Sequence, residues 1–297
     1  MIDINSLKKY EPIYVIGHNN PDVDTMLSSY LLSNILKYFG IKSYYCFLRE
    51  GYTPSSYNGR LVNDYLDFNP IIIDNNDVSN YHFALVDHND PMQSIKTAEN
   101  VVFGMDHHRD SGKASNILFG KTCSNGLFIY EYFKDIYNFS EKEKELIYLT
   151  TMCDTLFFKS DRYTSYNRDL INELGIDLDS EKLLKKYFAP TDLSMGIKKY
   201  LEKSDRDFAY HGVLFSSSVI HSFDDNNKIL EYKEEISKRN DNHLGMWRDL
   251  TNNKTYAFLK VNGQFTEFQY DLIASRASTV MLDVIEFLKQ QKNEKEK

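Results

Sequence analysis

The sequence has few cysteines, no long apolar run and no basic leader segment. Its three cysteines, Cys46, Cys123 and Cys153, are widely spaced, which argues against a disulfide framework and against a zinc site built on paired cysteines. No stretch of about 18 apolar residues is present, as a membrane-spanning helix would require. The N-terminus lacks the basic and apolar regions of a signal peptide. We therefore expect no membrane association and a reducing, cytoplasmic setting.

An excess of positive charge is also missing. The chain has 35 Lys and Arg against 43 Asp and Glu, a formal net charge of −8, so we expect no nucleic-acid polymer as partner. A small phosphate ligand remains compatible, because a few cations or bound metal ions reverse the field locally. The 297 residues, 42% hydrophobic and 26% charged, are typical of a globular protein with room for two domains.

Apolar segments alternate with helical patterns through the first part of the chain, which favours a mainly parallel sheet covered by helices. The predicted strands are Pro12–Gly17, Ser43–Leu48, Pro70–Ile73, His82–Val86 and Val101–Met105. The predicted helices between and after them are Asp24–Phe39, Ser56–Leu66, Asn125–Tyr137 and Lys142–Met152.

A proline break near Pro190 predicts a domain boundary. We expect an α/β N-terminal domain over residues 1–188, a linker over 189–194, and a smaller α/β C-terminal domain over 195–297. The C-terminal pattern predicts strands at Gly212–Ile220 and Tyr256–Val261. It predicts helices at Lys228–Arg239 and Thr279–Lys289. The active site is expected at the domain interface.

Acidic and histidine side chains follow several of the predicted buried elements. They are His18, Asp22, Asp24, Asp87, Asp106, His107, His108 and Asp154. Ligands of parallel sheets lie beyond the carboxyl ends of the strands, so these groups can meet at one edge. Clustered buried carboxylates need compensating cations, and carboxylate with imidazole suits Mn²⁺, Fe²⁺, Co²⁺ or Zn²⁺, with oxygen ligands favouring Mn²⁺.

Each segment by itself has an ordinary explanation. An Asp-His-His tripeptide such as 106–108 is often a surface turn, and an aspartate at a strand end is often a helix cap. The joint occurrence of four such segments favours a metal site, in which one aspartate bridges two ions roughly 3.5–4 Å apart.

The same segments resemble a known family. The loop His18-Asn19-Asn20-Pro21-Asp22-Val23-Asp24, the strand ends Val86-Asp87-His88-Asn89 and Asp106-His107-His108-Arg109, and Asp154-Thr155 occur in the order found in the DHH phosphoesterase superfamily. Within it, the chain is similar to the family II, manganese-dependent inorganic pyrophosphatases. The resemblance is strong in the N-terminal domain and weaker beyond it. A Gly-Gly-Gly-His motif, typical of members that cleave oligoribonucleotides, is missing, and the C-terminal domain resembles the pyrophosphatase and exopolyphosphatase type.

This resemblance implies roles for the individual residues. His18 and Asp22 would bind one metal ion, Asp24, His107 and Asp154 the other, and Asp87 would bridge them. His108 would face the substrate, Asp106 would orient a histidine, and His88 is expected to be a structural hydrogen-bonding residue. The implied cofactors are two Mn²⁺, with Co²⁺ or Mg²⁺ as alternatives, and a further Mg²⁺ that accompanies the substrate.

The C-terminal domain departs from the family pattern. Arg206 stands where the family has a lysine, Arg276 is kept, and Ala277 replaces the lysine that follows it. Lysine and arginine bind phosphate differently, because only arginine offers a planar fork of donors. The resemblance implies that Arg206 and Arg276 bind substrate, although each residue fits an ordinary surface or ion-paired arginine equally well.

The expected function is metal-dependent hydrolysis of a phosphoanhydride, most simply inorganic pyrophosphate to two phosphates, by a hydroxide that bridges two divalent metal ions. A short-chain exopolyphosphatase, or another small phosphate-ester or nucleotide phosphoesterase, is the first alternative. A catalytically reduced regulatory protein that binds metal or phosphate is the second. The expected partner is a small phosphate substrate, and a homodimer stays open.

Overall fold

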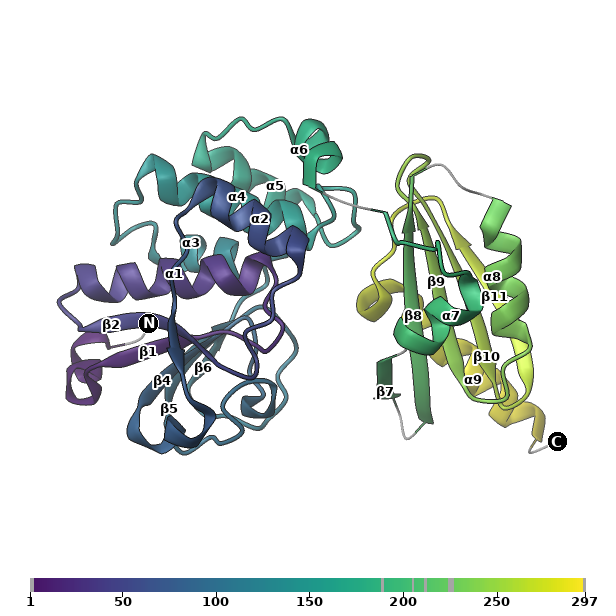
Figure 1. The fold of residues 1–297 in the computed structure, drawn as a ribbon, viewed down its shortest axis with the longest axis horizontal. Helices are drawn as coiled ribbons and strands as arrows, with labels where there is room; N and C mark the ends of the chain where they lie inside the picture. Colours follow the sequence, from purple (N-terminus) through teal and green to yellow (C-terminus); the bar gives the residue numbers. More distant parts are fainter. Residues whose placement is uncertain (1–2, 188–189, 205, 211–212, 224–226, 296–297) are drawn as a thin grey trace. The chain divides into compact units, whose positions relative to one another are not determined.

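The computed structural model describes residues 3–187, 190–204, 206–210, 213–223 and 227–295. The chain forms two compact units (Figure 1). The first contains Met1–Phe158 and Tyr163–Phe188, and the second contains Lys159–Arg162 and Ala189–Lys297. The short segment Lys159–Arg162 differs from the predicted boundaries. It belongs to the second unit because Ser160 forms a parallel bridge with Ile273.

The first unit is built on a six-stranded sheet. Its strands are β1 (Ile13–Ile16), β2 (Ser43–Leu48), β3 (Ile71–Ile73), β4 (His82–Val86), β5 (Val101–Asp106) and β6 (Ile117–Phe119). They lie in the order β3-β2-β1-β4-β5-β6, and every pairing is parallel. The predicted mainly parallel sheet is confirmed. The strand order reverses between β1 and β4, which is where open α/β sheets bind ligands.

Six α-helices occur in the described part of the first unit. They are α1 (Val23–Tyr38), α2 (Ser56–Tyr65), α3 (Asn125–Phe133), α4 (Glu141–Asp154), α5 (Ser165–Leu174) and α6 (Ser180–Tyr187). Helix α1 packs against β1 and β2 and also against α3 and α4. Ser140 and Glu143 form a reciprocal capping box that begins α4. No described helix of either unit is long and apolar enough to cross a membrane.

The second unit contains a five-stranded mixed sheet. Its strands are β7 (Arg206–Tyr210), β8 (Val213–Ser222), β9 (His243–Asp249), β10 (Lys254–Val261) and β11 (Gln264–Tyr270), in the order β11-β10-β9-β8-β7. Strands β8 and β9 are parallel, whereas the other neighbours are antiparallel. The helices are α7 (Ile197–Ser204), α8 (Asn227–Ser237) and α9 (Met281–Lys295), which a π-helical turn, η4 (Arg276–Val280), precedes.

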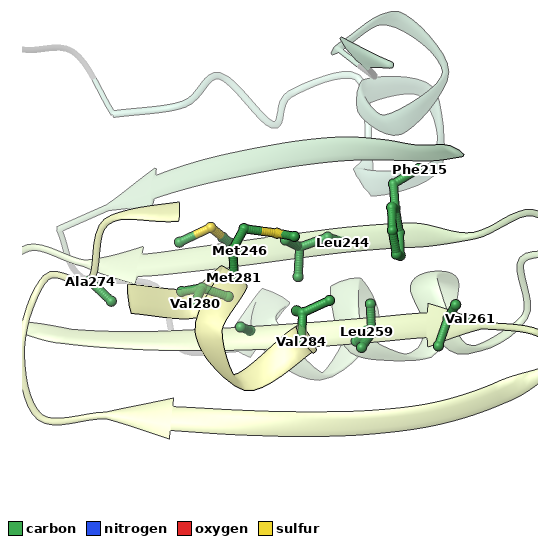
Figure 2. Packing of buried hydrophobic residues seen from close by; sticks show 10 residues of the cluster. Phe215, Leu244, Met246, Leu259, Val261, Ala274, Val280, Met281 and Val284 are labelled. Carbon is green, nitrogen blue, oxygen red and sulfur yellow. The ribbon is translucent and has the colours of Figure 1, made fainter. Parts of the chain in front are cut away.

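Alternation along the strands divides this sheet into two buried faces. Leu244, Met246 and Leu259 lie on the face covered by η4 and α9, where they pack with Met281 and Val284 (Figure 2). Trp247 points to the opposite face and packs in a cluster that includes Tyr232 and Ile236 of α8. Because both faces are covered, this sheet has a buried core on each side, and the predicted smaller α/β C-terminal domain is confirmed.

Candidate metal centre

The predicted acidic and histidine residues of the first unit meet at the carboxyl edge of its sheet. His18, Asp22 and Asp24 follow β1, Asp87 follows β4, and Asp154 is the last residue of α4. Asp106 is the last residue of β5, and His107 and His108 come directly after it. Three groups of these side chains have ligand atoms within 4.8 Å of one another. The structure therefore brings all eight residues together.

One group consists of His18, Asp22 and Asp87. The Nε2 atom of His18 lies 3.7 Å from Asp22 Oδ2 and 3.5 Å from Asp87 Oδ2. Its other ring nitrogen, Nδ1, donates to the carbonyl oxygen of Asn19 at 2.9 Å. That hydrogen bond keeps the proton on Nδ1 and leaves Nε2 to face the carboxylates, which is how proteins orient metal-binding imidazoles.

A second group consists of Asp24, His107 and Asp154. The Nε2 atom of His107 lies 3.5 Å from Asp154 Oδ2 and 3.9 Å from Asp24 Oδ2. Its Nδ1 atom is 3.3 Å from the carbonyl oxygen of Thr122. The two groups thus share one design, an imidazole Nε2 facing two aspartates with Nδ1 near a backbone carbonyl.

Asp87 lies between the two groups. Its Oδ2 faces His18, whereas its Oδ1 lies 3.2 Å from His107 Nε2. Thr25 Oγ1 donates to Oδ2 at 2.5 Å, but in the described part of the chain Oδ1 is buried and accepts no hydrogen bond of good geometry. The backbone of Asp87 is left-handed, with φ of 60°, a strained conformation for a residue other than glycine. Because its two carboxylate oxygens face different histidines, Asp87 can reach both groups.

Asp24 is fully buried at the start of α1. Its Oδ2 accepts from the backbone N–H of Asn125 at 2.5 Å, and its Oδ1 accepts from the N–H of Gly126 at 2.9 Å. These two amides begin α3, where a helix stabilises negative charge. Even so, burial and the charges of Asp87 and Asp22 raise the pKa of Asp24 well above its usual value.

The electrostatic balance of the cluster indicates a site for cations. Burial lowers the pKa of His18, but its contacts with Asp22 and Asp87 outweigh burial and raise that pKa to about 11. Burial favours protonated Asp87, but His107 and His18 hold its pKa well below the usual range. Crowded carboxylates, two oriented imidazoles and the buried Oδ1 of Asp87 match the ligands of divalent metal ions, so the residues present fit the predicted metals.

Asp106 contacts His108 and is fully buried. Its Oδ1 accepts from His108 Nδ1 at 2.8 Å and from the His108 backbone N–H at 3.1 Å, and Asn89 Nδ2 donates to its Oδ2 at 2.5 Å. Burial favours the neutral acid, but the contacts with His108 and Asn89 lower the pKa of Asp106. The His108 side chain is 51% exposed, so its imidazole is oriented by Asp106 and reachable from solvent.

His88 is fully enclosed and separate from the two groups. Its Nδ1 donates to the carbonyl oxygen of Val86 at 2.8 Å, and its Nε2 lies 2.7 Å from Ser94 Oγ. Burial lowers the pKa of His88 to about 4, so the ring is neutral near pH 7. This arrangement agrees with the structural role expected for His88.

The two predicted substrate arginines belong to the second unit. Arg276 begins η4 and donates from Nη1 to Ser217 Oγ at 2.8 Å. Arg206 is the first residue of β7, but its side chain lies outside the described part of the structure, as does that of Ala277. The predicted substrate role of Arg206 and Arg276 stays a prediction.

The sequence analysis missed several residues that hold the site. Thr25 and Asn89 donate to Asp87 and Asp106, and the amides of Asn125 and Gly126 hold Asp24. Asn89 lies within one predicted motif and Thr25 directly follows another, which was an available signal. Asn125 lies 101 positions from Asp24, and no local pattern connects the two.

Comparison with known proteins agrees with this arrangement of strands and ligands. Residues 12–154 match the sequence profile of the DHH family, N-terminal domain. Residues 12–154 therefore form a DHH-family domain. All the metal-ligand candidates of the first unit lie within this DHH domain.

Two further proteins are similar to larger parts of the chain. A "Probable manganese-dependent inorganic pyrophosphatase" of Clostridium acetobutylicum is 27% identical over 194 residues, which are 59% of this chain and 58% of the relative's length. The chain thus aligns with little more than half of that relative. A Methanococcus jannaschii crystal structure, assigned by name to the family II inorganic pyrophosphatases, matches with a TM-score of 0.62 at 18% identity. That match covers 84% of this chain and 87% of the other, and it shows a shared fold around the DHH domain.

Proposed function

We propose that this protein is a metal-dependent phosphohydrolase that cleaves a phosphoanhydride, most simply inorganic pyrophosphate to two phosphates. The observation that supports the proposal best is the position of Asp87, whose two carboxylate oxygens face His18 on one side and His107 on the other. A carboxylate shared between two ligand groups is suited to two divalent ions that act on one phosphoryl group. The names of the similar proteins agree with this substrate class.

The proposed ligand sets follow from the geometry of the two groups. His18 and Asp22 would hold one ion, Asp24, His107 and Asp154 would hold the other, and Asp87 would contact both. Mn²⁺ is the proposed metal because most of these ligands are carboxylate oxygens. Bound divalent ions lower the pKa of a coordinated water and withdraw charge from phosphoryl oxygens.

The other residues orient groups and transfer protons. Asp106 holds Nδ1 of His108, so the exposed face of this imidazole can donate a proton to the departing phosphate when the anhydride P–O bond breaks. Arg276, and Arg206 by resemblance, bind phosphoryl oxygens in this proposal. Thr25 fixes the rotamer of Asp87, which keeps its two oxygens directed at the two groups.

One sequence feature favours a second candidate substrate. Ala277 occupies the position of a family lysine, so one expected cation is missing from the second unit. A site with less positive charge binds a compact, highly charged ligand less tightly. Short polyphosphates or nucleoside polyphosphates are therefore the second candidate substrates.

A substrate panel tests the proposal. Purified protein with Mn²⁺ is assayed for phosphate release from pyrophosphate, tripolyphosphate and a nucleoside triphosphate. We expect turnover of at least one, and a loss on the order of 100-fold or more in Asp87→Asn, beyond the ~10–100-fold typical of residues next to metal ligands. Asp90→Asn is the matched control, because Asp90 lies three residues away and pairs with Lys113.

Four outcomes of this panel decide between the candidate functions. Preference for pyrophosphate supports the first substrate, and preference for a longer chain supports the second. Full Mn²⁺-dependent turnover in Asp87→Asn would show that the proposed metal centre is wrong. Bound Mn²⁺ without turnover on any substrate would favour a regulatory protein instead of an enzyme.

A further inference from the structure

The second unit contains an arginine whose charge is not balanced by its hydrogen-bond partners. Arg248 lies near the end of the central strand β9, half-buried, with His221 of β8 as its register partner. Its Nη2 donates to the carbonyl oxygen of Ala274 at 2.9 Å, and its Nη1 lies 3.3 Å from His221 Nε2. Its Nε is buried and makes no hydrogen bond to any described residue.

Neither partner of Arg248 carries negative charge. Ala274 contributes a neutral carbonyl, and burial together with the charge of Arg248 lowers the pKa of His221 to about 3, so this imidazole is neutral. Burial lowers the pKa of Arg248 only to about 10, which keeps the guanidinium protonated near pH 7. Within the described residues, no carboxylate forms an ion pair with Arg248.

The surrounding charges are mostly positive. The positive charges of Arg276 and Arg162 lower the pKa of Arg248, whereas the negative charge of Asp161 raises it. Asp161 is already engaged, because it accepts from the backbone N–H of Ser275 at 3.0 Å and from the hydroxyl of Thr279. Two further arginines and one hydrogen-bonded carboxylate thus act electrostatically on Arg248, in a protein whose net charge is −8.

Such an arrangement is costly unless an anion completes it. A half-buried guanidinium whose hydrogen-bond partners are neutral loses hydration that an imidazole and one carbonyl replace only in part. Arg276 lies two residues beyond Ala274, the residue that binds Arg248, and its Nη1 donates to Ser217 Oγ at 2.8 Å. Two guanidinium groups, with the Ser217 hydroxyl beside one of them, are donors suited to the oxygens of a phosphate group.

We propose that Arg248 and Arg276 form an anion site in the second unit that binds a phosphate or diphosphate group. Arg248 supplies the second cation that the sequence lacks at position 277, where alanine replaces lysine. The assignment of this anion as substrate or product rests on the proposed phosphohydrolase function. The binding of phosphate itself does not.

A titration without metal isolates this site. Inorganic phosphate is titrated calorimetrically into the full-length protein in EDTA, because the carboxylates of the metal-free first unit repel anions. We expect wild type to bind phosphate and Arg248→Met to bind it about 10- to 100-fold more weakly, the loss typical of a charged hydrogen-bond donor. Arg239→Met is the matched control, because Arg239 lies in the same unit and already pairs with Asp241.

A structural role for Arg248 gives a different result. If Arg248 only held the Ala274 carbonyl, Arg248→Met would lower stability but leave phosphate affinity unchanged, and this outcome in folded protein overturns the proposal. Absence of phosphate binding by wild type overturns it as well. If Arg248→Met does not fold, Arg248→Lys decides, because it keeps the charge and loses the planar fork. An affinity reduced several-fold supports the site, and an unchanged affinity contradicts it.

The enzymatic readout separates this proposal from the preceding one. In a substrate assay with Mn²⁺, Arg248→Met should raise KM about 10-fold or more with a smaller effect on kcat. Phosphate binding that depends on Arg248 without any turnover would leave the anion site standing and contradict the proposed function. If turnover depends on Asp87 but neither KM nor phosphate affinity changes in Arg248→Met, the proposed function stands and the anion site is wrong.

Discussion

At the scale of single residues, the position of each imidazole proton organises the candidate centre. His18 and His107 both place Nδ1 near a backbone carbonyl oxygen, so both direct Nε2 at carboxylates. His108 differs, because its Nδ1 contacts the charged side chain of Asp106. The residue-level contacts therefore separate two prospective ligands from one prospective acid.

This distinction leads to a prediction for Asp106→Asn. The substitution keeps the shape of the side chain but removes its charge, and the NH2 group of the new Asn must face either Asn89 Nδ2–H or His108 Nδ1–H, both of which are donors. We expect the Mn²⁺ content to stay near that of wild type, whereas kcat falls about 10- to 100-fold because His108 loses its orientation. Metal analysis and steady-state kinetics on the same sample test this. A lost metal ion would show that Asp106 acts as a ligand.

At the scale of elements, the close approach of α1, α3 and α4 positions Asp24. Gly126 lies in the first turn of α3, and its N–H donates to Asp24 Oδ1. A Cβ at position 126 would lie 2.7 Å from Thr150 Cγ2 and would also collide with the hydroxyl of that residue in α4. Only glycine allows α3 to bring its first amides this close to Asp24 while α4 packs beside it.

The element-scale prediction concerns Gly126→Ala. We expect it to reduce the free energy of unfolding by about 1–3 kcal/mol through overpacking, and to weaken Mn²⁺ binding because the α3 amides move away from Asp24. Urea denaturation and equilibrium dialysis measure the two effects. Gly59→Ala is the control. Gly59 lies inside α2 with no atom within 4 Å of a new Cβ, so alanine should stabilise the helix by about 0.5–1 kcal/mol.

The paired strands β8 and β9 enclose a neutral histidine. His243 is fully buried, with Nδ1 2.6 Å from Ser216 Oγ and Nε2 2.8 Å from Ser218 Oγ. Burial, followed by the charge of Arg239, lowers its pKa from 6.5 to about 3. Above pH 6.5 the imidazole is neutral in both the folded and the unfolded chain. Below that value only the unfolded chain takes up the proton, until the pH approaches about 3.

Stability of the second unit should therefore fall as the pH decreases from 6.5 toward 3. We expect His243 to contribute a loss of about 1.4 kcal/mol per pH unit in this window. Urea denaturation at pH 6.5 and 5.5 measures it, and His243→Gln should show a smaller pH dependence while still bonding the serines. The exposed His82 provides the control as His82→Gln. An unchanged pH slope in His243→Gln would contradict the prediction.

At the scale of the whole molecule, the two compact units divide the proposed chemistry between them. The metal-ligand candidates belong to the first unit, and the arginines of the proposed anion site belong to the second. Only four residues, 155–158, separate Asp154 from Lys159–Arg162 of the second unit, and Leu156, Phe157 and Phe158 all have left-handed backbone. Left-handed backbone is costly for bulky side chains such as these.

This division predicts selective stabilisation by metal. At an Mn²⁺ concentration about 100-fold above its Kd, the first unit should gain about 2.7 kcal/mol. The chain has a single tryptophan, Trp247, in the second unit, so its fluorescence reports unfolding of that unit. We expect Mn²⁺ to shift the far-ultraviolet circular dichroism transition more than the tryptophan transition. Equal shifts, or a shift that persists in Asp87→Asn, would contradict the prediction.

The sequence by itself determined the first sheet and the prospective metal ligands. Strands buried on both faces form continuous apolar runs, which is why β1, β4 and β5 could be predicted. Acidic and histidine residues follow each of these runs, so Asp87 and His107 could be predicted with them. Strand β9 escaped prediction although it is central. Position 245 in this strand is a glycine because β9 packs closely against α8, and a Cβ there would lie 2.8 Å from Tyr232 Oη. No local sequence pattern predicts that contact.

Only the tertiary structure decided how distant groups combine. The amides that hold Asp24 come from a helix about one hundred residues later, and the environment of Arg248 arises from β8, β9 and the segment before η4. Composition and periodicity depend on neighbours in the chain, whereas charge balance, burial and close approach depend on neighbours in space. The residue types could be read from the sequence, but which charge has a counter-ion is a property of the fold.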